Sequence, residues 1–148
     1  MQQIGKKGLS NRRWIVGGKL CFLLNHLGQV VAWECETANV NDTAFHQLIR
    51  RFDRTIVFSD FGFHAKEGDP ANLKVYEPFQ HNERMIVETV LSMLTTICHF
   101  KKVMHHVWEN FQARLAFTMA TFNLLVGWHG FHPDHSSFVQ LSIAEFSL

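Results

Sequence analysis

The chain has 148 residues, of which 47% are hydrophobic, 18% charged and 13% aromatic. This mixture is too apolar for an intrinsically disordered chain and too polar for a bundle of membrane helices, and the length predicts one domain. The three cysteines match no zinc-binding or CxxC spacing, so we expect reduced core thiols in an intracellular protein.

Charge is unevenly distributed, although the net charge is only +1. The first 33 residues contain lysines and arginines but no carboxylate, and Glu34 is the first acidic residue. Such an opening indicates either a polyanionic partner or a solvated basic tail. It does not predict a signal peptide, because Lys19 interrupts the apolar run 15–24 and no small-residue cleavage site follows. The apolar run 115–126 is too short to span a bilayer, so we expect a cytoplasmic protein without membrane contact.

The first predicted elements form a β-hairpin. Trp14–Leu24 is rich in aromatic and branched residues, and Val30–Thr37 alternates apolar with polar residues. The short connection Asn25–Gly28 between them is typical of a hairpin. A short helix is expected next, for which Asn41 and Asp42 offer an N-cap.

A strand and an irregular segment are predicted in the middle of the chain. Thr55–Ser59 is a continuous apolar run too short for a helix, which predicts a strand that is buried on both faces and ends at Asp60. Residues 61–80 contain several glycines and prolines and are expected to be the most irregular part. Within them, Leu73–Tyr76 predicts one short strand.

Two long helices are predicted after this segment. The pattern from Asn82 to Phe100 is apolar nearly all round, which predicts a core helix. A second helix is expected at about His105–Trp128, followed by a tail that ends in the apolar stretch Phe138–Leu148. The resulting order of strands and helices predicts a mixed α/β domain.

Two carboxylates are the candidates for chemistry. Asp60 follows a strand, and ligand sites in α/β sheets lie beyond the carboxyl ends of strands. Glu88 lies in the middle of an apolar helix, where a buried carboxylate needs a partner or a metal ion. Two hard carboxylates suit Mg²⁺ or Mn²⁺. The alternatives are a salt bridge between Arg84 and Glu88 on one helix face and an ordinary turn or capping role for Asp60.

Other polar clusters are weaker candidates. The segment His129–His135 holds three histidines at a spacing of three, but its glycine and proline favour a polar surface loop over a zinc site. Lys101 and Lys102 precede two histidines, which together predict a cationic helix start. The pair Gly17–Gly18 lacks the context of a phosphate-binding loop.

Several short motifs occur in a fixed order along residues 4–130. They are Trp14-x-x-Gly17-Gly18-Lys19-Leu20, Gly28-Gln29-Val30, Thr37-x-x-x-Asn41-Asp42, Phe58-Ser59-Asp60-x-Gly62-Phe63 and Asn82-Glu83-Arg84-x-x-x-Glu88. Together they resemble the catalytic core of an insertion-sequence DDE transposase. The segments Asn110–Arg114 and Phe122–Leu125 resemble the C-terminal helix of that family. The Arg-x-x-x-Glu signature is partial, because His81 and Thr95 replace the aromatic and lysine that flank it in the family.

This resemblance implies a ribonuclease H-like mixed sheet with flanking helices. It makes Asp60 and Glu88 the second and third carboxylates of a catalytic triad. In the family, three carboxylates hold two divalent ions, Mg²⁺ or Mn²⁺, which activate water or a 3′-hydroxyl to attack a DNA phosphodiester. Arg84 would steady Glu88 or touch a DNA phosphate. The remaining residues expected to bind DNA or support the site are Lys19, Arg12, Arg13, Lys101 and Lys102.

The sequence departs from the family pattern at the first aspartate of the triad, which should lie on a strand before the hairpin. No acidic residue precedes Glu34. That strand is also the middle of the family's sheet, between the hairpin and the strand that ends at Asp60. We therefore expect a sheet that is incomplete at its N-terminus, in a truncated copy or in a second reading frame whose upstream product supplies the first aspartate. The expected division is a basic segment 1–13, a catalytic-core part 14–130 and a tail 131–148.

Three functions remain open from the sequence. The first is the C-terminal part of a DDE transposase, which we expect to be inactive in cleavage on its own. The second is a catalytically inactive DNA-binding remnant, and the third is an unrelated soluble α/β domain in which Arg84 and Glu88 are merely structural. The sheet edges left open by a missing strand also predict that copies of the chain associate.

Overall fold

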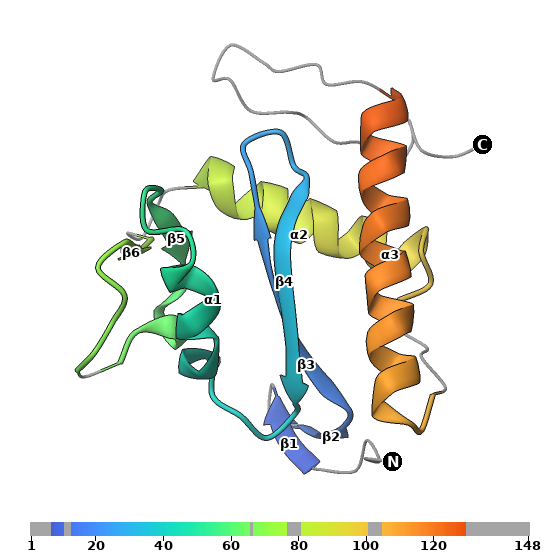
Figure 1. Cartoon of the computed structure of the whole chain (residues 1–148), viewed down its shortest axis with the longest axis horizontal. Coiled ribbons are helices and arrows are strands. Elements are labelled where there is room, and N and C mark those ends of the chain that lie inside the picture. Colours follow the sequence, from blue (N-terminus) through green and yellow to red (C-terminus); the bar gives the residue numbers. More distant parts are fainter. Residues whose placement is uncertain (1–6, 11–12, 66, 77–80, 101–104, 130–148) are drawn as a thin grey trace. The chain divides into compact units, whose positions relative to one another are not determined.

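The computed structural model describes residues 7–10, 13–65, 67–76, 81–100 and 105–129. For residues 7, 9–10, 13–16 and 81–85 it describes the backbone and not the side chains. This part of the chain is mixed α/β, with two-stranded sheets and three α-helices (Figure 1). The prediction of an α/β class is confirmed at this level.

The N-terminal strands form two antiparallel pairs. Strand β1 (Lys7–Ser10) pairs with β2 (Arg13–Val16), and β3 (Gly18–Leu24) pairs with β4 (Val30–Thr37). The predicted hairpin is confirmed for β3 and β4. The single strand expected over Trp14–Leu24 is wrong in its first part, because the chain breaks at Gly17 and β2 pairs instead with β1, a strand that the sequence does not predict. In the hairpin turn, Asn25 Oδ1 accepts hydrogen bonds from the backbone N–H groups of Leu27 at 3.1 Å and Gln29 at 2.9 Å. Gly28 closes the turn at φ 76°, a conformation that glycine adopts without steric cost.

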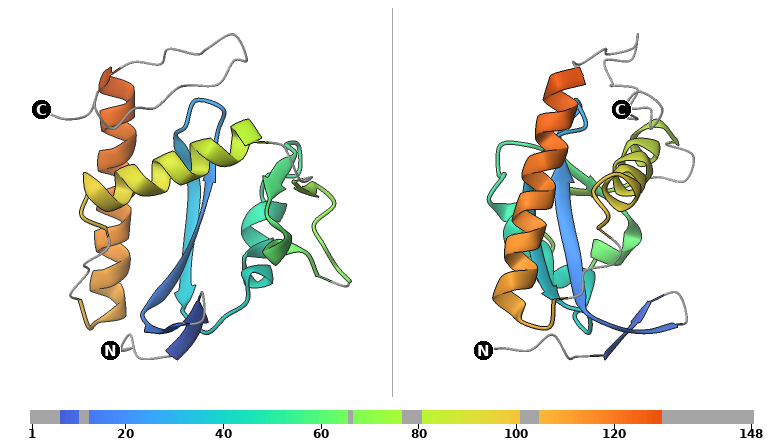
Figure 2. Two further views of the ribbon diagram at one scale, coloured as in Figure 1. Left: turned by 180° about the vertical axis from the view of Figure 1, so that it is seen from behind. Right: turned by 90° about the vertical axis from the view of Figure 1, so that its right-hand side faces the viewer.

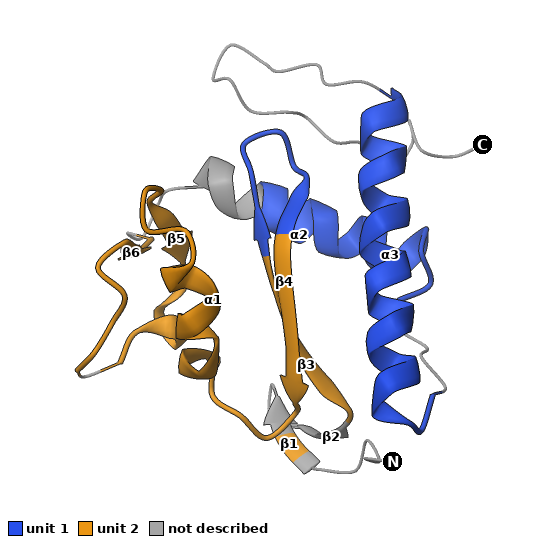
Figure 3. Cartoon of the chain, in the orientation of Figure 1, with its two compact units in different colours: residues 1–3, 23–31, 81–148 blue, residues 4–22, 32–80 orange. Residues whose placement is uncertain are grey.

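The chain divides into two compact units, coloured separately in Figure 3. Unit 2 consists of residues 4–22 and 32–80 and contains the base of the hairpin. After β4 it continues with the 3₁₀ helix η1 (Asp42–Phe45), α1 (His46–Arg50), β5 (Val57–Ser59), the 3₁₀ helix η2 (Phe61–Phe63) and β6 (Leu73–Val75). Strands β5 and β6 pair in parallel.

The core of unit 2 forms where η1 and α1 turn their apolar side chains inward. Phe45, Leu48 and Ile49 are all at most 1% exposed. The carboxamide of Asn72, next to β6, donates to the carbonyl oxygens of Ile49 and Phe52, each at 3.0 Å. Because the last carbonyls of a helix lack intrahelical partners, this side chain ends α1 and holds it against β6.

Unit 1 consists of residues 1–3, 23–31 and 81–148 and contains the tip of the hairpin. Its helices are α2 (His81–Thr96) and α3 (Trp108–His129), which cross one another (Figure 2). The Asn123 side chain of α3 makes two hydrogen bonds with Val30 in β4. Its Oδ1 accepts from the Val30 N–H at 2.9 Å, and its Nδ2 donates to the Val30 carbonyl at 2.8 Å. The residues buried most completely between these elements are Val90, Met93, Leu94, Leu115, Phe122 and Val126.

Two burial predictions are wrong. The strand at 55–59 was expected to be buried on both faces, but Ile56 and Phe58 are 52% and 43% exposed. A strand of three residues in a two-stranded sheet leaves its side chains partly open to solvent. The helix from residue 82 was expected to be buried all round, but Val87 and Leu91 in α2 are 38% and 44% exposed. Only one face of α2 therefore belongs to the core.

Candidate functional site

Asp60 lies where the sequence placed it, directly after β5. It is the N-cap of η2, and its Oδ1 accepts a hydrogen bond from the Gly62 N–H at 3.1 Å. The residue is exposed, and its alternative role as a capping residue is confirmed by this bond. An exposed carboxylate at a strand end remains accessible to a cation or to a ligand, so the capping bond and a metal-binding role are compatible.

A second carboxylate, Asp42 at the start of η1, lies next to Asp60 within unit 2. A Cβ placed on Gly62 would lie 2.7 Å from Asp42 Oδ2 and 3.2 Å from Asp60 Oδ1, so both carboxylates border the same small space. Asp42 also forms an ion pair with Lys19 on β3, with 2.9 Å between Nζ and Oδ1. Of the two N-cap candidates in the sequence, Asn41 is the N-cap of η1, although its side chain makes no capping bond, and Asp42 is the first residue of η1.

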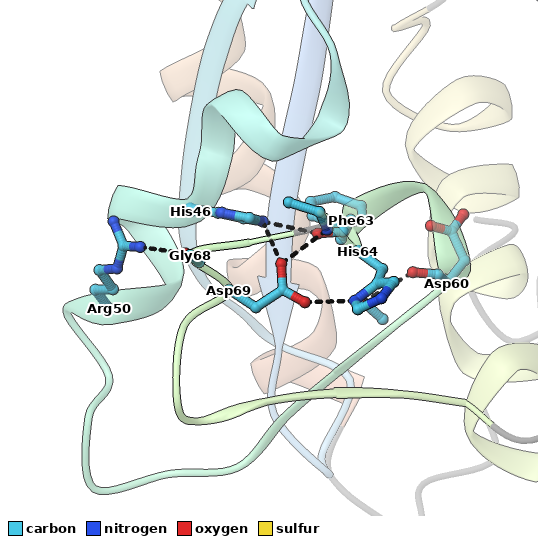
Figure 4. A network of polar contacts seen from close by, with 9 residues as sticks. His46, Arg50, Asp60, Phe63, His64, Gly68 and Asp69 are labelled. Carbon is cyan, nitrogen blue, oxygen red and sulfur yellow. Dashed lines mark hydrogen bonds and ion pairs between the residues drawn. The ribbon is translucent and has the colours of Figure 1, made fainter.

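The loop after Asp60 is held by a polar network, drawn in Figure 4. Asp69 accepts a hydrogen bond from the Ala65 N–H at 2.8 Å through Oδ1 and contacts His64 Nδ1 through Oδ2. His46 is buried, and its Nε2 donates to the Phe63 carbonyl at 2.7 Å and lies 3.9 Å from Asp69 Oδ1. The sequence predicted this segment to be irregular and missed the network, which joins residues 23 positions apart.

The pKa of Asp69 is lowered by its surroundings. The hydrogen bond from the Ala65 N–H has the largest lowering effect, and the hydrogen bond and charge of His64 and the charge of His46 lower it further. Desolvation opposes these effects. Asp69 is therefore ionised in the folded protein, and its charge holds both ends of the loop 65–69.

Glu88 lies in the middle of α2 in unit 1 and is exposed. The prediction that it is a buried carboxylate among apolar neighbours is wrong, because it projects from the side of α2 that faces solvent. Its proposed salt-bridge partner Arg84 is in α2, but the side chain of Arg84 lies outside the described residues. Asp60 belongs to unit 2, and the expectation that the Asp60 and Glu88 carboxylates share one cleft stays a prediction.

The predicted DNA-contacting residues differ in how far the structure describes them. Lys19 pairs with Asp42, which places its charge beside the Asp60 site. Arg13 belongs to β2, with its side chain outside the described residues, and Arg12 lies outside them altogether. The predicted cationic helix start at Lys101 and Lys102 also lies outside the described residues.

In the described part of the chain, no three His, Cys, Asp or Glu side chains are grouped so that they could hold a metal ion. Of the histidine segment 129–135, only His129, at the end of α3, is described. Asp42 and Asp60 both border Gly62, but these two carboxylates alone do not make such a group.

The cysteines of the hairpin are buried, as the sequence predicted. Cys21 on β3 and Cys35 on β4 are each 5% exposed. The pKa of each thiol is raised to about 12, chiefly by burial and to a smaller extent by nearby charges, those of Asp42 and Glu34 for Cys21 and that of Glu36 for Cys35. Glu34 Oε2 is buried without a hydrogen-bond partner among the described residues. The three free thiols, including the half-buried Cys98, form no disulfide with one another.

Comparison with known proteins adds no relative: no protein-family model, curated protein or solved structure matches this chain. Among the described residues, none of the helices combines the length and apolar character that a membrane crossing requires.

Proposed function

We propose that this chain is the C-terminal part of a ribonuclease H-like DDE transposase core and that it acts on DNA. The main observation in support of this proposal is the way the strands pair. The hairpin β3–β4 and the parallel pair β5–β6 form separate two-stranded sheets, and within the described residues neither β5 nor β6 pairs with the hairpin. A ribonuclease H-like sheet that lacks the strand between the hairpin and the Asp60 strand would divide at this point.

The order of elements supports the same proposal. The elements follow in this order: the hairpin, a short helix, the strand β5 directly before Asp60, its parallel partner β6, and the long helix that carries Glu88. Both carboxylates are exposed, so neither is occupied in the packing of the core. Carboxylate oxygens are the ligands that hard divalent cations such as Mg²⁺ and Mn²⁺ prefer. When bound by Asp60 and Glu88, Mg²⁺ or Mn²⁺ would supply activation of a water or hydroxyl for attack on a phosphodiester.

Other side chains of the chain would bind and orient the DNA. Arg12, Arg13, Lys101 and Lys102 would contact backbone phosphates, which supplies affinity without reading the base sequence. Lys19 is engaged with Asp42, so its role is to balance acidic charge beside Asp60 as much as to contact DNA. The first aspartate of the triad has no counterpart before Glu34, and the proposal requires another polypeptide segment to supply it.

Manganese binding tests the metal site directly. We expect electron paramagnetic resonance of Mn²⁺ to show binding by the wild-type chain, weakened by at least about tenfold in Asp60→Asn and in Glu88→Gln, because each removes a charged oxygen ligand. Asp53→Asn and Glu109→Gln are matched controls, since both residues are exposed carboxylates outside the site. Equal Mn²⁺ binding by all four variants would refute the metal site.

DNA binding tests the second part of the proposal. We expect weak binding of duplex DNA, measured by fluorescence anisotropy, with an affinity that falls steeply as salt concentration rises. Replacing Arg12 and Arg13 by alanine should reduce the salt dependence, whereas Arg51→Ala, in an exposed residue after α1, should not. Binding that is absent at low salt would contradict a role on DNA.

A catalytically inactive DNA-binding remnant is the second candidate. The observation that favours it is the Lys19–Asp42 ion pair, which neutralises a carboxylate that borders the same space at Gly62 as Asp60. Magnesium-dependent nicking of DNA distinguishes the two candidates. The remnant stays inactive when the product of the upstream reading frame is added, whereas the transposase part gains nicking that Asp60→Asn abolishes.

A further inference from the structure

An uncharged apolar stripe runs along the exposed face of α3. Phe117 and Leu124 are each 72% exposed and Trp128 is 88% exposed. Ala113, Ala120 and Thr121 are also exposed and lie between them at spacings of three and four residues, so all six side chains share one side of the helix. The opposite side of α3 carries its buried residues, which include Leu115, Phe122 and Val126.

We propose that this stripe, defined as residues 113, 117, 120, 121, 124 and 128, is the interface of an antiparallel α3–α3 homodimer. The proposal is independent of the function proposed above. An antiparallel arrangement centred between Ala120 and Thr121 places Phe117 of one copy opposite Leu124 of the other. It also places Trp128 opposite Ala113, so that a large side chain meets a small one at each end.

The sizes and charges along the stripe favour this arrangement over a parallel one. A parallel pair would set Trp128 against Trp128 and Phe117 against Phe117, which crowds large side chains at the same level. It would also bring the two Arg114 side chains together at one edge, where like charges repel. In the antiparallel pair the two Arg114 residues lie at opposite ends of the interface. Antiparallel helices in addition align their dipoles favourably.

The area of the stripe suits a weak, reversible pair. Its six positions extend over about 22 Å of helix at 1.5 Å per residue. Burial of three large side chains from each copy, at roughly 150 Å² apiece, totals about 900 Å², slightly below the roughly 1,000 Å² of a stable specific interface and in the range of weak, reversible ones. At about 450 Å² per copy, the stripe is as large as the largest apolar patch of a typical monomer, and such patches often serve in binding. A two-fold symmetric dimer buries the stripes of both copies in a single interface, because each copy contributes the same surface.

Charge variants at the stripe test the dimer and its direction. We expect sedimentation velocity to show a concentration-dependent dimer of the full chain. Phe117→Glu and Leu124→Lys should each weaken it by at least about tenfold, because each places a charge in an apolar contact. Ala116→Glu is the matched control, since Ala116 is exposed and next to Phe117 in sequence but points about 100° away around the helix.

Mixing the two charge variants then decides the orientation. In an antiparallel pair the two introduced charges face each other and the other end keeps its native Phe117–Leu124 contact, so the mixture of Phe117→Glu and Leu124→Lys should dimerise again. A parallel pair gives no such rescue. A wild-type chain that is monomeric over a wide concentration range, as expected if another segment of the same chain covers the stripe, would overturn the proposal, and so would a dimer unaffected by either variant.

Discussion

The Asn123 side chain occupies the place of a neighbouring strand for one residue of β4. A backbone N–H and carbonyl at the edge of a hairpin would otherwise depend on water, and the carboxamide satisfies both groups of Val30. In the sequence, Asn123 belongs to the segment Phe122–Leu125, which resembles the C-terminal helix of the transposase family. In the structure, the Asn123 side chain links α3 to the tip of the hairpin within unit 1, and we call this pair of hydrogen bonds the clasp.

Asn123→Ala should therefore destabilise unit 1. Two hydrogen bonds are lost and both Val30 groups are left without these partners, so we expect a loss of about 1–3 kcal/mol in the free energy of unfolding. Urea denaturation measures this loss. Asn110→Ala, in an exposed residue of the same helix, is the matched control and should change stability far less. Similar losses in the two variants would show that the clasp contributes nothing.

The Asp69 network gives the loop after Asp60 a dependence on pH. The folded-state pKa of Asp69 is depressed, so its contribution to stability is fully present above the ordinary aspartate pKa near 4 and is lost as the pH falls through the lower folded value. Amide hydrogen exchange of Ala65 should accordingly accelerate in that acidic range beyond its intrinsic pH dependence. In Asp69→Asn this extra acid-dependent change should vanish, and its persistence would mean that another group controls the loop.

At the scale of elements, the sequence predicted local structure well and tertiary contacts poorly. The hairpin followed from its turn residues Asn25 and Gly28, and the two long helices followed from their apolar spacing. Strand β1 was missed because Lys7–Ser10 has neither an apolar alternation nor a turn signal of its own. The proximity of Asp42 to Asp60 could not be predicted, since it depends on how η1 and η2 pack rather than on sequence spacing.

The fit of β1 against the end of β4 is tight at Gly8. A Cβ on Gly8 would lie 1.9 Å from the carbonyl oxygen of Ala38, and backbone atoms cannot move aside cheaply. Gly8→Ala should therefore lower the free energy of unfolding by about 1–3 kcal/mol, or detach β1–β2 from the base of the hairpin. Gly127→Ala provides the contrast: it lies in α3 with nothing within 4 Å of a Cβ, and it should stabilise the helix by up to about 1 kcal/mol. Denaturant titration of both variants checks the opposite signs, and an unchanged Gly8→Ala protein would contradict the tight fit.

At the scale of the whole molecule, small sheets make the architecture marginal. Each described sheet has two strands, and an isolated two-stranded sheet is barely stable in water without helices packed on it. We therefore expect a free energy of unfolding at the low end of the usual range of about 5–15 kcal/mol. Under the function proposed above, a segment that supplies the strand between the hairpin and β5 should raise the melting temperature sharply. Calorimetry with and without the upstream polypeptide measures this rise, and a high melting temperature that the added segment leaves unchanged would show that these sheets need no further strand.

Because the thiols of Cys21 and Cys35 are buried, their rate of chemical labelling can be used to measure opening of the hairpin. With a pKa raised to about 12, Cys21 and Cys35 are protonated at neutral pH, and their sulfur atoms are also shielded from reagents by burial. We therefore expect alkylation at these positions to be slow until β3 and β4 separate, and to be faster at the half-buried Cys98, which serves as an internal reference. The labelling rate at Cys21 and Cys35, measured by mass spectrometry, thus reports the rate at which β3 and β4 separate locally while the rest of the chain stays folded.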